Sequence, residues 1–324
     1  MTNNGEEKRA GMKKADCGGY AGKIPSVRLM TALDFSAILS DTNPDTEVTI
    51  CTYNLSGPID QYIACMWHLK NCTLMVTKLT GAYRQLFEKY LSNIRLVEVP
   101  ASHAKIILIA PNRVYLSSQN LFQVGMFQHA EMIEDEIAYE VYKKMTHRRG
   151  GNLRGFHGEA YSEALNYDPL FEGNVVPDSE GITLKNVRGK YQTMLNYNGN
   201  LNSIYNRDII ICTYTLPGKP YVAKVLEKLD RNGNRITLIA NSVMQNRIKE
   251  LEEVADFDYH LFDNIHAKMI LCSKDGERGD YITLLSSQNF GLSTWFENTL
   301  RLKGEKPYIY YKEKIEEFIA FSFS

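Results

Sequence analysis

The sequence predicts an α/β fold made of two repeats, related by a pseudo-twofold axis and each containing a largely parallel sheet. The first observation is that three short segments occur twice: 48–56 with 209–217, 103–108 with 266–271, and 117–120 with 286–289. The offset between the copies grows from 161 to 163 and then to 169 residues. Short loop insertions in the second copy would produce this growth, so we interpret the segments as an internal duplication.

The second observation is that strand and helix patterns alternate between these anchors in both copies. The helical patterns lie at 59–70, 82–91, 221–230 and 243–254. The strand patterns lie at 72–77, 94–99, 114–118, 235–240, 258–262 and 282–287. Strands that alternate with helices of this length indicate βαβ crossovers, and therefore parallel pairing.

The third observation is the change of composition along the chain, which divides it into four parts. Residues 1–24 are predicted to be a disordered tail, followed by a first repeat at 25–145 and a second at 206–324. The connector at 146–205 is rich in Gly, Asn and Tyr. A long irregular segment of this kind either covers a functional site or simply links the repeats over the surface. The apolar and aromatic end of the chain is expected to pack as a closing helix or strand.

The overall composition is that of a soluble globular protein. Of the 324 residues, 44% are hydrophobic and 23% are charged, which argues against wholesale disorder. The formal net charge of -1 excludes the strong positive field of a dedicated nucleic-acid binder, so any polyanion must meet a local patch. The absence of a long apolar run predicts a soluble, cytoplasmic protein that neither spans nor contacts a membrane. The six cysteines form no CxxC pair and are interpreted as reduced core residues.

The repeated segments carry residues suited to phosphodiester chemistry. Side chains two apart on a strand share a face, so the histidine and lysine of each HAK segment are expected to stand side by side. The serine and asparagine of each SSQN segment share a face in the same way. The predicted catalytic residues are His103, Lys105, His266 and Lys268. The predicted phosphate-binding residues are Ser118, Asn120, Ser287 and Asn289.

Two such faces meeting at one point would need neither a cofactor nor a metal. One histidine would attack phosphorus, the other would protonate the leaving group, and the lysines and asparagines would stabilise the developing charge. No cluster of His, Cys, Asp or Glu with metal-ligand spacing is visible in the sequence.

At this point the chain resembles the phospholipase D superfamily, whose signature is His-x-Lys followed by Gly/Ser-Ser-x-Asn, usually in two copies. Asn120 follows His103 by 17 residues, the usual family spacing, whereas Asn289 follows His266 by 23. The loop at 273–281 accounts for the longer second spacing. The resemblance covers about 48–135 and 208–302.

The chain departs from this signature at one position, because the acidic residue expected after each lysine is replaced by Ala110 and Ser273. This pattern is similar to the tyrosyl-DNA phosphodiesterase branch and to certain nucleases of the superfamily. The family's downstream acidic residue suggests Glu131 and Glu297 as supports for the histidines. Both could equally be carboxylates on an edge strand.

Several other polar residues have two possible interpretations. The serines, with Gln119 and Gln288, either contact the substrate or only close hydrogen bonds at strand ends. The basic segment at 147–154 is either a phosphate-backbone patch or, as we favour, a solvated helix end. The tyrosines at 190–206 either stack on bases or pack in the core.

We therefore expect a metal-independent phosphodiesterase, most plausibly a nuclease acting on DNA or RNA through a phosphohistidine at His103. The alternatives are an end-processing enzyme similar to tyrosyl-DNA phosphodiesterase, a phospholipase, and a non-catalytic nucleic-acid-binding protein on the same fold. A monomer would suffice for the site, and the oligomeric state stays open.

Overall fold

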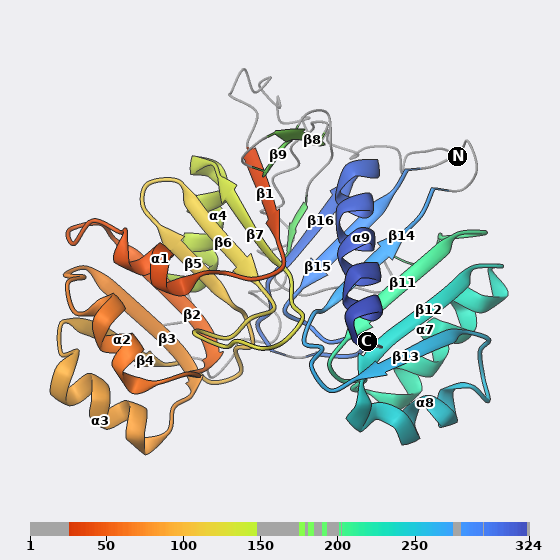
Figure 1. Cartoon of the computed structure of the whole chain (residues 1–324), viewed down its shortest axis with the longest axis horizontal. Helices are drawn as coiled ribbons and strands as arrows, with labels where there is room; N and C mark the ends of the chain where they lie inside the picture. The colour runs from red at the N-terminus through yellow and green to blue at the C-terminus, as the bar shows by residue number, and fades with distance from the viewer. Residues whose placement is uncertain are drawn as a thin grey trace, which may run out of the picture.

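The computed structural model describes residues 26–147, 175–178, 181–184, 190–192, 201, 203–274, 280–293 and 295–322. We call 26–147 the first half and 203–322 the second half. The predicted tail at 1–24 and most of the connector lie outside the described residues. Each half is built around its own sheet, and the two sheets lie side by side (Figure 1).

The first half holds strands and helices in the predicted alternation. Its elements are β1 (Ser26–Met30), α1 (Phe35–Ser40), β2 (Val48–Asn54), α2 (Ile59–Met66), β3 (Cys72–Lys78), α3 (Gly81–Tyr90), β4 (Ile94–Glu98), β5 (Ile106–Ile109), β6 (Arg113–Ser117), β7 (Ala130–Glu134) and α4 (Glu136–His147). Their strands follow the order β4-β3-β2-β5-β6-β7-β1. Two short strands of the connector, β9 (Gly181–Leu184) and β8 (Val175–Asp178), extend this sheet beyond β1.

The second half repeats this arrangement. Its elements are β11 (Asp208–Thr213), α7 (Lys219–Arg231), β12 (Arg235–Asn241), η1 (Ser242–Met244), α8 (Gln245–Leu251), β13 (Asp258–Phe262), β14 (Met269–Cys272), β15 (Ile282–Ser286), β16 (Thr299–Lys303) and α9 (Glu305–Ser322). The strand order is β13-β12-β11-β14-β15-β16, with β10 (Lys190–Gln192) added at β16. This order matches the first sheet strand for strand, which confirms the predicted α/β fold of two repeats.

The sheets are mixed, whereas the sequence predicts largely parallel ones. Pairing is parallel from β2 through β3 to β4 and from β11 through β12 to β13, where helices form the crossovers. The remaining pairs are antiparallel. The difference follows from connection length, because β5 and β6 are joined only by residues 110–112 and a parallel crossover needs a dozen residues or more.

Reciprocal contacts show that the halves are related by a local twofold axis. Ser102 forms a bridge to Phe296, and Phe127 forms one to Ile265. By the repeat offsets, Ile265 is the equivalent of Ser102 and Phe296 is the equivalent of Phe127. Each half therefore gives the other the contact that it receives, which is the signature of a twofold interface.

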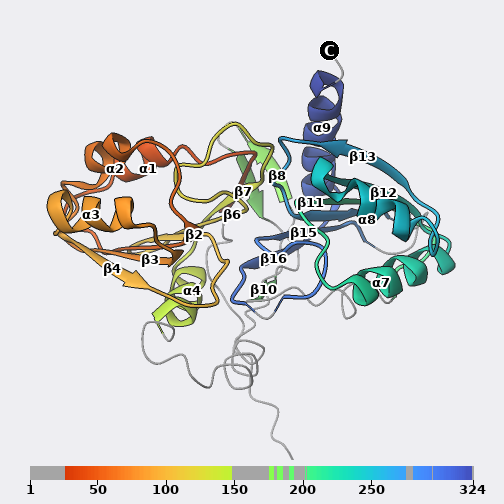
Figure 2. The ribbon, with the colours of Figure 1, turned by 90° about the horizontal axis from the view of Figure 1, so that it is seen from below.

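The core between the sheets comes from alternate residues of β5 and β14. Ile106 and Leu108 face Met269 and Leu271 in one apolar cluster shared by both halves. The alternating Ile107 and Ile109 instead pack under α2 and α3. Because successive strand residues point to opposite faces, these two buried strands contribute to both the shared cluster and the outer core. Figure 2 shows the two halves side by side from a second direction.

Candidate active site

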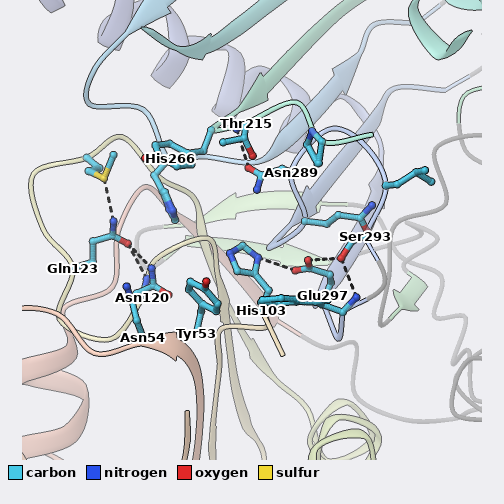
Figure 3. A pocket seen from close by; sticks show the side chains of 16 residues that line it. Tyr53, Asn54, His103, Asn120, Gln123, Thr215, His266, Asn289, Ser293 and Glu297 are labelled. Atoms are coloured by element: carbon cyan, nitrogen blue, oxygen red, sulfur yellow. Dashed lines mark hydrogen bonds and ion pairs between the residues drawn. The ribbon is translucent and has the colours of Figure 1, made fainter. Parts of the chain in front are cut away.

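A pocket of about 520 Å³ opens where the two halves meet, and residues of both halves line it (Figure 3). The lining residues are Tyr53, Asn54, His103, Asn120, Gln123, Met126, Tyr214, Thr215, Pro217, His266, Gln288, Asn289, Leu292, Ser293, Trp295 and Glu297. His103 and His266 face this same space from opposite sides (Figure 3). The duplication thus produces one shared pocket rather than two separate ones.

Each histidine is held in place by the opposite half. The backbone N–H of His103 donates to the carbonyl of Phe296 at 2.8 Å, and that of His266 donates to the carbonyl of Phe127 at 2.9 Å. Both histidines precede a strand, β5 or β14, whose buried residues anchor the segment from behind. The position of each imidazole therefore depends on the interface between the halves.

The Nδ1 contacts of the two imidazoles differ in charge. Nδ1 of His103 lies 3.1 Å from Oε2 of Glu297, whereas Nδ1 of His266 lies 3.2 Å from Oε1 of Gln128. Gln128 and Glu297 occupy equivalent repeat positions, 169 residues apart. The two imidazoles are thus matched in geometry and distinguished by a carboxylate on one and a neutral amide on the other.

Lys105 and Lys268 are buried directly beneath the histidines, with 3% and 2% of their surface exposed. Nζ of Lys105 donates to the carbonyl of His103 at 2.5 Å, and Nζ of Lys268 donates to that of His266 at 2.6 Å. Neither lysine is among the residues that line the pocket, so the charge of the lysines would act from behind the histidines on an anion such as a phosphate.

Asn120 and Asn289 line the pocket at turns that two threonines hold. Oγ1 of Thr52 accepts the backbone N–H of Leu121, and Oγ1 of Thr213 accepts that of Phe290. This explains why the Cys-Thr-Tyr sequence at the end of β2 recurs at the end of β11. Its threonine fixes the residue directly after each site asparagine.

Ser118 and Ser287 do not line the pocket, which changes their predicted role. Both are fully buried, and their hydroxyls donate to the side chains of Gln128 and Glu297. They contact the two side chains that lie beside the histidines, as in the alternative interpretation of hydrogen bonding at strand ends. The neighbouring Gln119 braces the turn after it by donating to the carbonyl of Gln123.

The structure corrects the prediction for Glu131, because the Glu131 side chain contacts neither His103 nor His266. Its carboxylate bonds to Nδ1 of His129 at 2.8 Å and accepts the hydroxyl of Tyr311 at 2.9 Å. The position equivalent to Glu297 is Gln128, three residues earlier. Glu131 lies on β7, whereas Gln128 lies in the segment before that strand, so the two side chains reach different partners.

Burial and charge shift the pKa values of the histidines and lysines downward. Burial and the charge of Lys105 lower the pKa of His103 to about 4, although Glu297 acts in the opposite direction. Burial, aided by Lys268 and Lys105, lowers the pKa of His266 as well. Burial lowers the pKa of Lys105 to about 7, and burial with the charge of Lys105 lowers that of Lys268.

The carboxylate beside His103 stays ionised. Burial acts to raise the pKa of Glu297, but the bonds from His103 and Ser287 and the charge of Lys105 outweigh it and lower the pKa. The pocket therefore pairs neutral imidazoles with one buried carboxylate. A bound anion would offset the lysine charges and favour protonation of the groups around it.

Two aromatic residues of the pocket lie outside the set predicted from the sequence. The Tyr53 ring packs 5.0 Å from the His103 ring, and the Tyr214 ring packs 5.1 Å from the His266 ring, measured between centroids. Their repetition in the Cys-Thr-Tyr segment was the signal for this role. Gln128 gave no such signal, because only alignment of the repeats reveals its equivalence to Glu297.

Comparison with known proteins shows agreement in fold rather than in sequence. No protein-family model and no curated protein sequence matches the chain. Phosphatidylserine synthase of Haemophilus influenzae is structurally similar, with a TM-score of 0.58 and 11% identity over 91% of this chain and 88% of its own. Polyphosphate kinase of Porphyromonas gingivalis gives a TM-score of 0.51 with 13% identity, covering 86% of this chain but only 47% of its own.

Both neighbours are members of the phospholipase D superfamily. The chain has the phospholipase D fold. The likeness to these two structures is one of fold, and in this chain the fold brings a His-x-Lys segment from each half to one interface.

Two features are absent from the part of the chain that the structure describes. No group of three or more His, Cys, Asp or Glu side chains lies there in a position to hold a metal ion. Among the same residues, no helix combines the length and apolar character that crossing a bilayer requires.

Proposed function

We propose that this protein is a nuclease that hydrolyses phosphodiesters through a covalent intermediate on His103, with His266 as the general acid. Nε2 of His103 attacks phosphorus, so that a P–N bond forms while the P–O bond to the leaving group breaks. His266 donates a proton to the departing oxygen. Water, deprotonated by His266, then attacks phosphorus and breaks the P–N bond, which regenerates both histidines.

The unequal partners of the two imidazoles carry this assignment. Attack leaves a positive charge on the phosphorylated ring, and the Glu297 carboxylate at Nδ1 compensates it. Gln128 offers His266 no such charge, so a protonated His266 remains the stronger acid of the two. Lys105 and Lys268 supply the positive charge that the transferred phosphoryl group needs.

A phospholipid is the second candidate substrate, and one observation favours it. Leu292 and Trp295 at the pocket expose 55% and 38% of their surfaces, which gives the pocket mouth an apolar side. A structural neighbour of this chain is a phosphatidylserine synthase. We prefer the nuclease because one of these two exposed residues, Trp295, has an aromatic ring on which a nucleic-acid base can stack.

The test is degradation of labelled single-stranded DNA, duplex DNA, RNA and phosphatidylcholine vesicles, each in excess EDTA. We expect nucleic acid to be cleaved at the same rate with and without EDTA. Loss of turnover in EDTA that magnesium or zinc restores would contradict the mechanism. Cleavage of the vesicles alone would replace the nuclease with a phospholipase.

Quenching wild-type enzyme and labelled substrate in alkaline denaturant tests the covalent step, because the P–N bond of a phosphohistidine is stable in base and hydrolysed in acid. We expect the label on His103, and none in a His103→Ala variant. Label on His266 would reverse the assignment of the two histidines. Full wild-type turnover without any trapped label would refute covalent catalysis.

A further inference from the structure

The two sides of the pocket differ in their aromatic content. On the His103 side, the Tyr53 and Trp295 rings lie 5.7 Å apart at a tilt of 45°, and both line the pocket. Trp295 is 38% exposed. Large aromatic rings gain most of their stabilisation from burial, so a partly exposed indole inside a catalytic pocket is available to a ligand.

The repeat provides an internal comparison for this feature. The equivalent of Trp295 in the first repeat is Met126, and the equivalent of Tyr53 in the second is Tyr214. The His266 side therefore has a tyrosine without a second ring beside it at this repeat position. Since the two sides derive from one duplicated unit, the difference indicates that they contact chemically different parts of the substrate.

Trp295 is also connected to the nucleophile through hydrogen bonds. Its backbone N–H donates to Oγ of Ser293 at 3.2 Å, and that hydroxyl donates to Oε1 of Glu297 at 2.9 Å. The other oxygen of Glu297 faces His103. A group bound to Trp295 would therefore contact segment 293–297, which also holds the carboxylate beside His103.

A cation lies on the same side of the pocket, outside the buried lysines. Nζ of Lys78, an exposed residue at the end of β3, lies 5.0 Å from the centre of the Tyr53 ring. By the register of the paired strands, the equivalent position in the second half is Ser242, whose hydroxyl donates to the carboxylate of Asp263. The His103 side thus has two aromatic rings, Tyr53 and Trp295, and the ammonium of Lys78. The equivalent positions on the His266 side hold one ring and no lysine.

We propose that Trp295 and Tyr53 form a stacking subsite for one base of a single-stranded nucleic acid, with Lys78 contacting the adjacent phosphate. This proposal rests on the phosphodiesterase function proposed above and specifies its substrate. Bases in a duplex are stacked on their neighbours, whereas a single strand presents their faces to an aromatic platform. His103 is recessed, with a side chain only 15% exposed, so the strand must also be flexible enough to enter.

Tryptophan fluorescence tests the stacking directly. The chain has two tryptophans, and Trp67 lies away from the pocket, just after α2. In a Trp67→Phe, His103→Ala variant, Trp295 is the only fluorophore of this type and turnover is blocked. We expect oligothymidylate to quench it, and an oligomer of the same length made of abasic units to bind about 5- to 150-fold more weakly without quenching. Equal quenching and affinity for both oligomers would overturn the proposal.

Kinetics of Trp295→Ala provide a second test that does not depend on the His103 variant. Thymidine p-nitrophenyl phosphate and methyl p-nitrophenyl phosphate share a leaving group and differ only in the retained group. We expect kcat/KM to fall about 5- to 150-fold for the thymidine ester and to stay within about twofold for the methyl ester. Trp67→Ala is the matched control, because this exposed tryptophan does not line the pocket, and it should change neither rate by more than about twofold.

Equal losses for the two esters would give Trp295 a merely structural role and overturn the subsite. Stronger quenching by phosphatidylcholine vesicles than by oligothymidylate would assign the surface to lipid and overturn it as well. If wild-type protein hydrolysed neither ester, the phosphodiesterase function would fail, and the fluorescence titration would still decide whether a base stacks on Trp295.

The contribution of Lys78 appears in the salt dependence of binding. Removing one protein–phosphate contact from a complex with a single strand reduces the slope of log affinity against log salt by about 0.7. We expect Lys78→Ala to show this reduction with oligothymidylate. Lys89→Ala is the matched control, because Lys89 also lies over a tyrosine ring, that of Tyr90, which does not line the pocket as Tyr53 does. The same slope in wild type and Lys78→Ala would remove the phosphate contact from the proposal.

Discussion

The histidines of the two identical His-Ala-Lys segments differ in the side chain that contacts Nδ1. That side chain is a glutamate for His103 and a glutamine for His266, and the two differ by a single atom. Glu297 and Gln128 occupy equivalent places, and each is held by an equivalent serine hydroxyl. Exchanging a carboxylate oxygen for an amide nitrogen changes the charge facing the imidazole without changing the shape of the site. The difference suits a duplicated and nearly symmetric pocket to the two protonation tasks of the phosphodiester hydrolysis that we propose.

Exchange of these two side chains should separate the tasks. Glu297→Gln removes the charge that stabilises the phosphorylated imidazole, so we expect kcat to fall about 10²–10⁴-fold for every substrate. Gln128→Glu should hold the proton on His266 and slow only substrates whose leaving group needs protonation. Rates with p-nitrophenyl and alkyl leaving groups measure both effects. The reverse pattern would make His266 the nucleophile.

The lowered pKa values predict the pH dependence of kcat/KM. Attack needs a neutral His103, whose pKa is about 4, so the rate should fall as the pH drops through that value. Anion binding needs the charge of Lys105, whose pKa is about 7, so with a p-nitrophenyl ester, which needs no proton, the rate should also fall as the pH rises through that second value. With an alkyl ester the decline should begin at lower pH, because His266 must be protonated and its pKa is lowered. In Lys105→Arg the charge persists, and the alkaline decline should shift upward. An unchanged decline in that variant would assign it to another group.

Among the helices and strands, the ends of β2 and β11 position residues of the pocket. Each strand ends with a threonine that fixes an asparagine turn and a tyrosine that packs on a histidine. Ligands of open α/β sheets bind at the carboxyl ends of the parallel strands, which is where both segments lie. The ends of β2 and β11 thus contribute Tyr53 and Tyr214 to the lining of the pocket.

Removing these threonine hydroxyls should destabilise the protein. In Thr52→Val and Thr213→Val, a buried backbone N–H loses its acceptor, and we expect the free energy of unfolding to fall by about 1–3 kcal/mol. Thr283→Val is the control, because the Thr283 hydroxyl is buried without a hydrogen-bond partner among the described residues. Urea unfolding measures all three. An equal loss in the control would show that the hydroxyl bonds are not the cause.

Across the molecule, α9 ties the two halves together. It belongs to the second half, yet the Tyr311 hydroxyl lies within 3.2 Å of the carbonyls of Met30 and Ala130 in the first. The same hydroxyl donates to the carboxylate of Glu131, which also bonds to Nδ1 of His129. Nε2 of His129 in turn lies 2.9 Å from the carbonyl of Ser286 in the second half. A buried polar network therefore crosses the interface on which both site histidines depend.

Tyr311→Phe should weaken this connection between the halves. Loss of the hydroxyl leaves the buried Glu131 with one donor fewer, so we expect the free energy of unfolding to fall by about 1–3 kcal/mol. Activity per folded molecule should stay unchanged. Tyr310→Phe, at a half-buried neighbouring position, is the matched control. Thermal unfolding of the two variants tests this, and equal effects would argue against a special role for the network.

The duplication and the α/β class can be predicted from the amino-acid sequence, and so can the fact that His103 and Asn120 share a pocket with their repeats, His266 and Asn289. These features are visible because strand periodicity and repeated segments are local properties of the chain. The mixed pairing of the sheets and the positions of β7 and β16 could not be predicted in this way, since pairing depends on which strands meet after folding.

The partners of the two histidines follow only from the folded structure. Glu297 lies 194 residues from His103, and Gln128 lies 138 residues from His266, so no local pattern could connect them. The same is true of the buried serines and of Glu131, whose direction along β7 depends on strand register. Only the twofold packing of the halves brings a carboxylate to one imidazole and an amide to the other, because that packing places each loop against the opposite repeat.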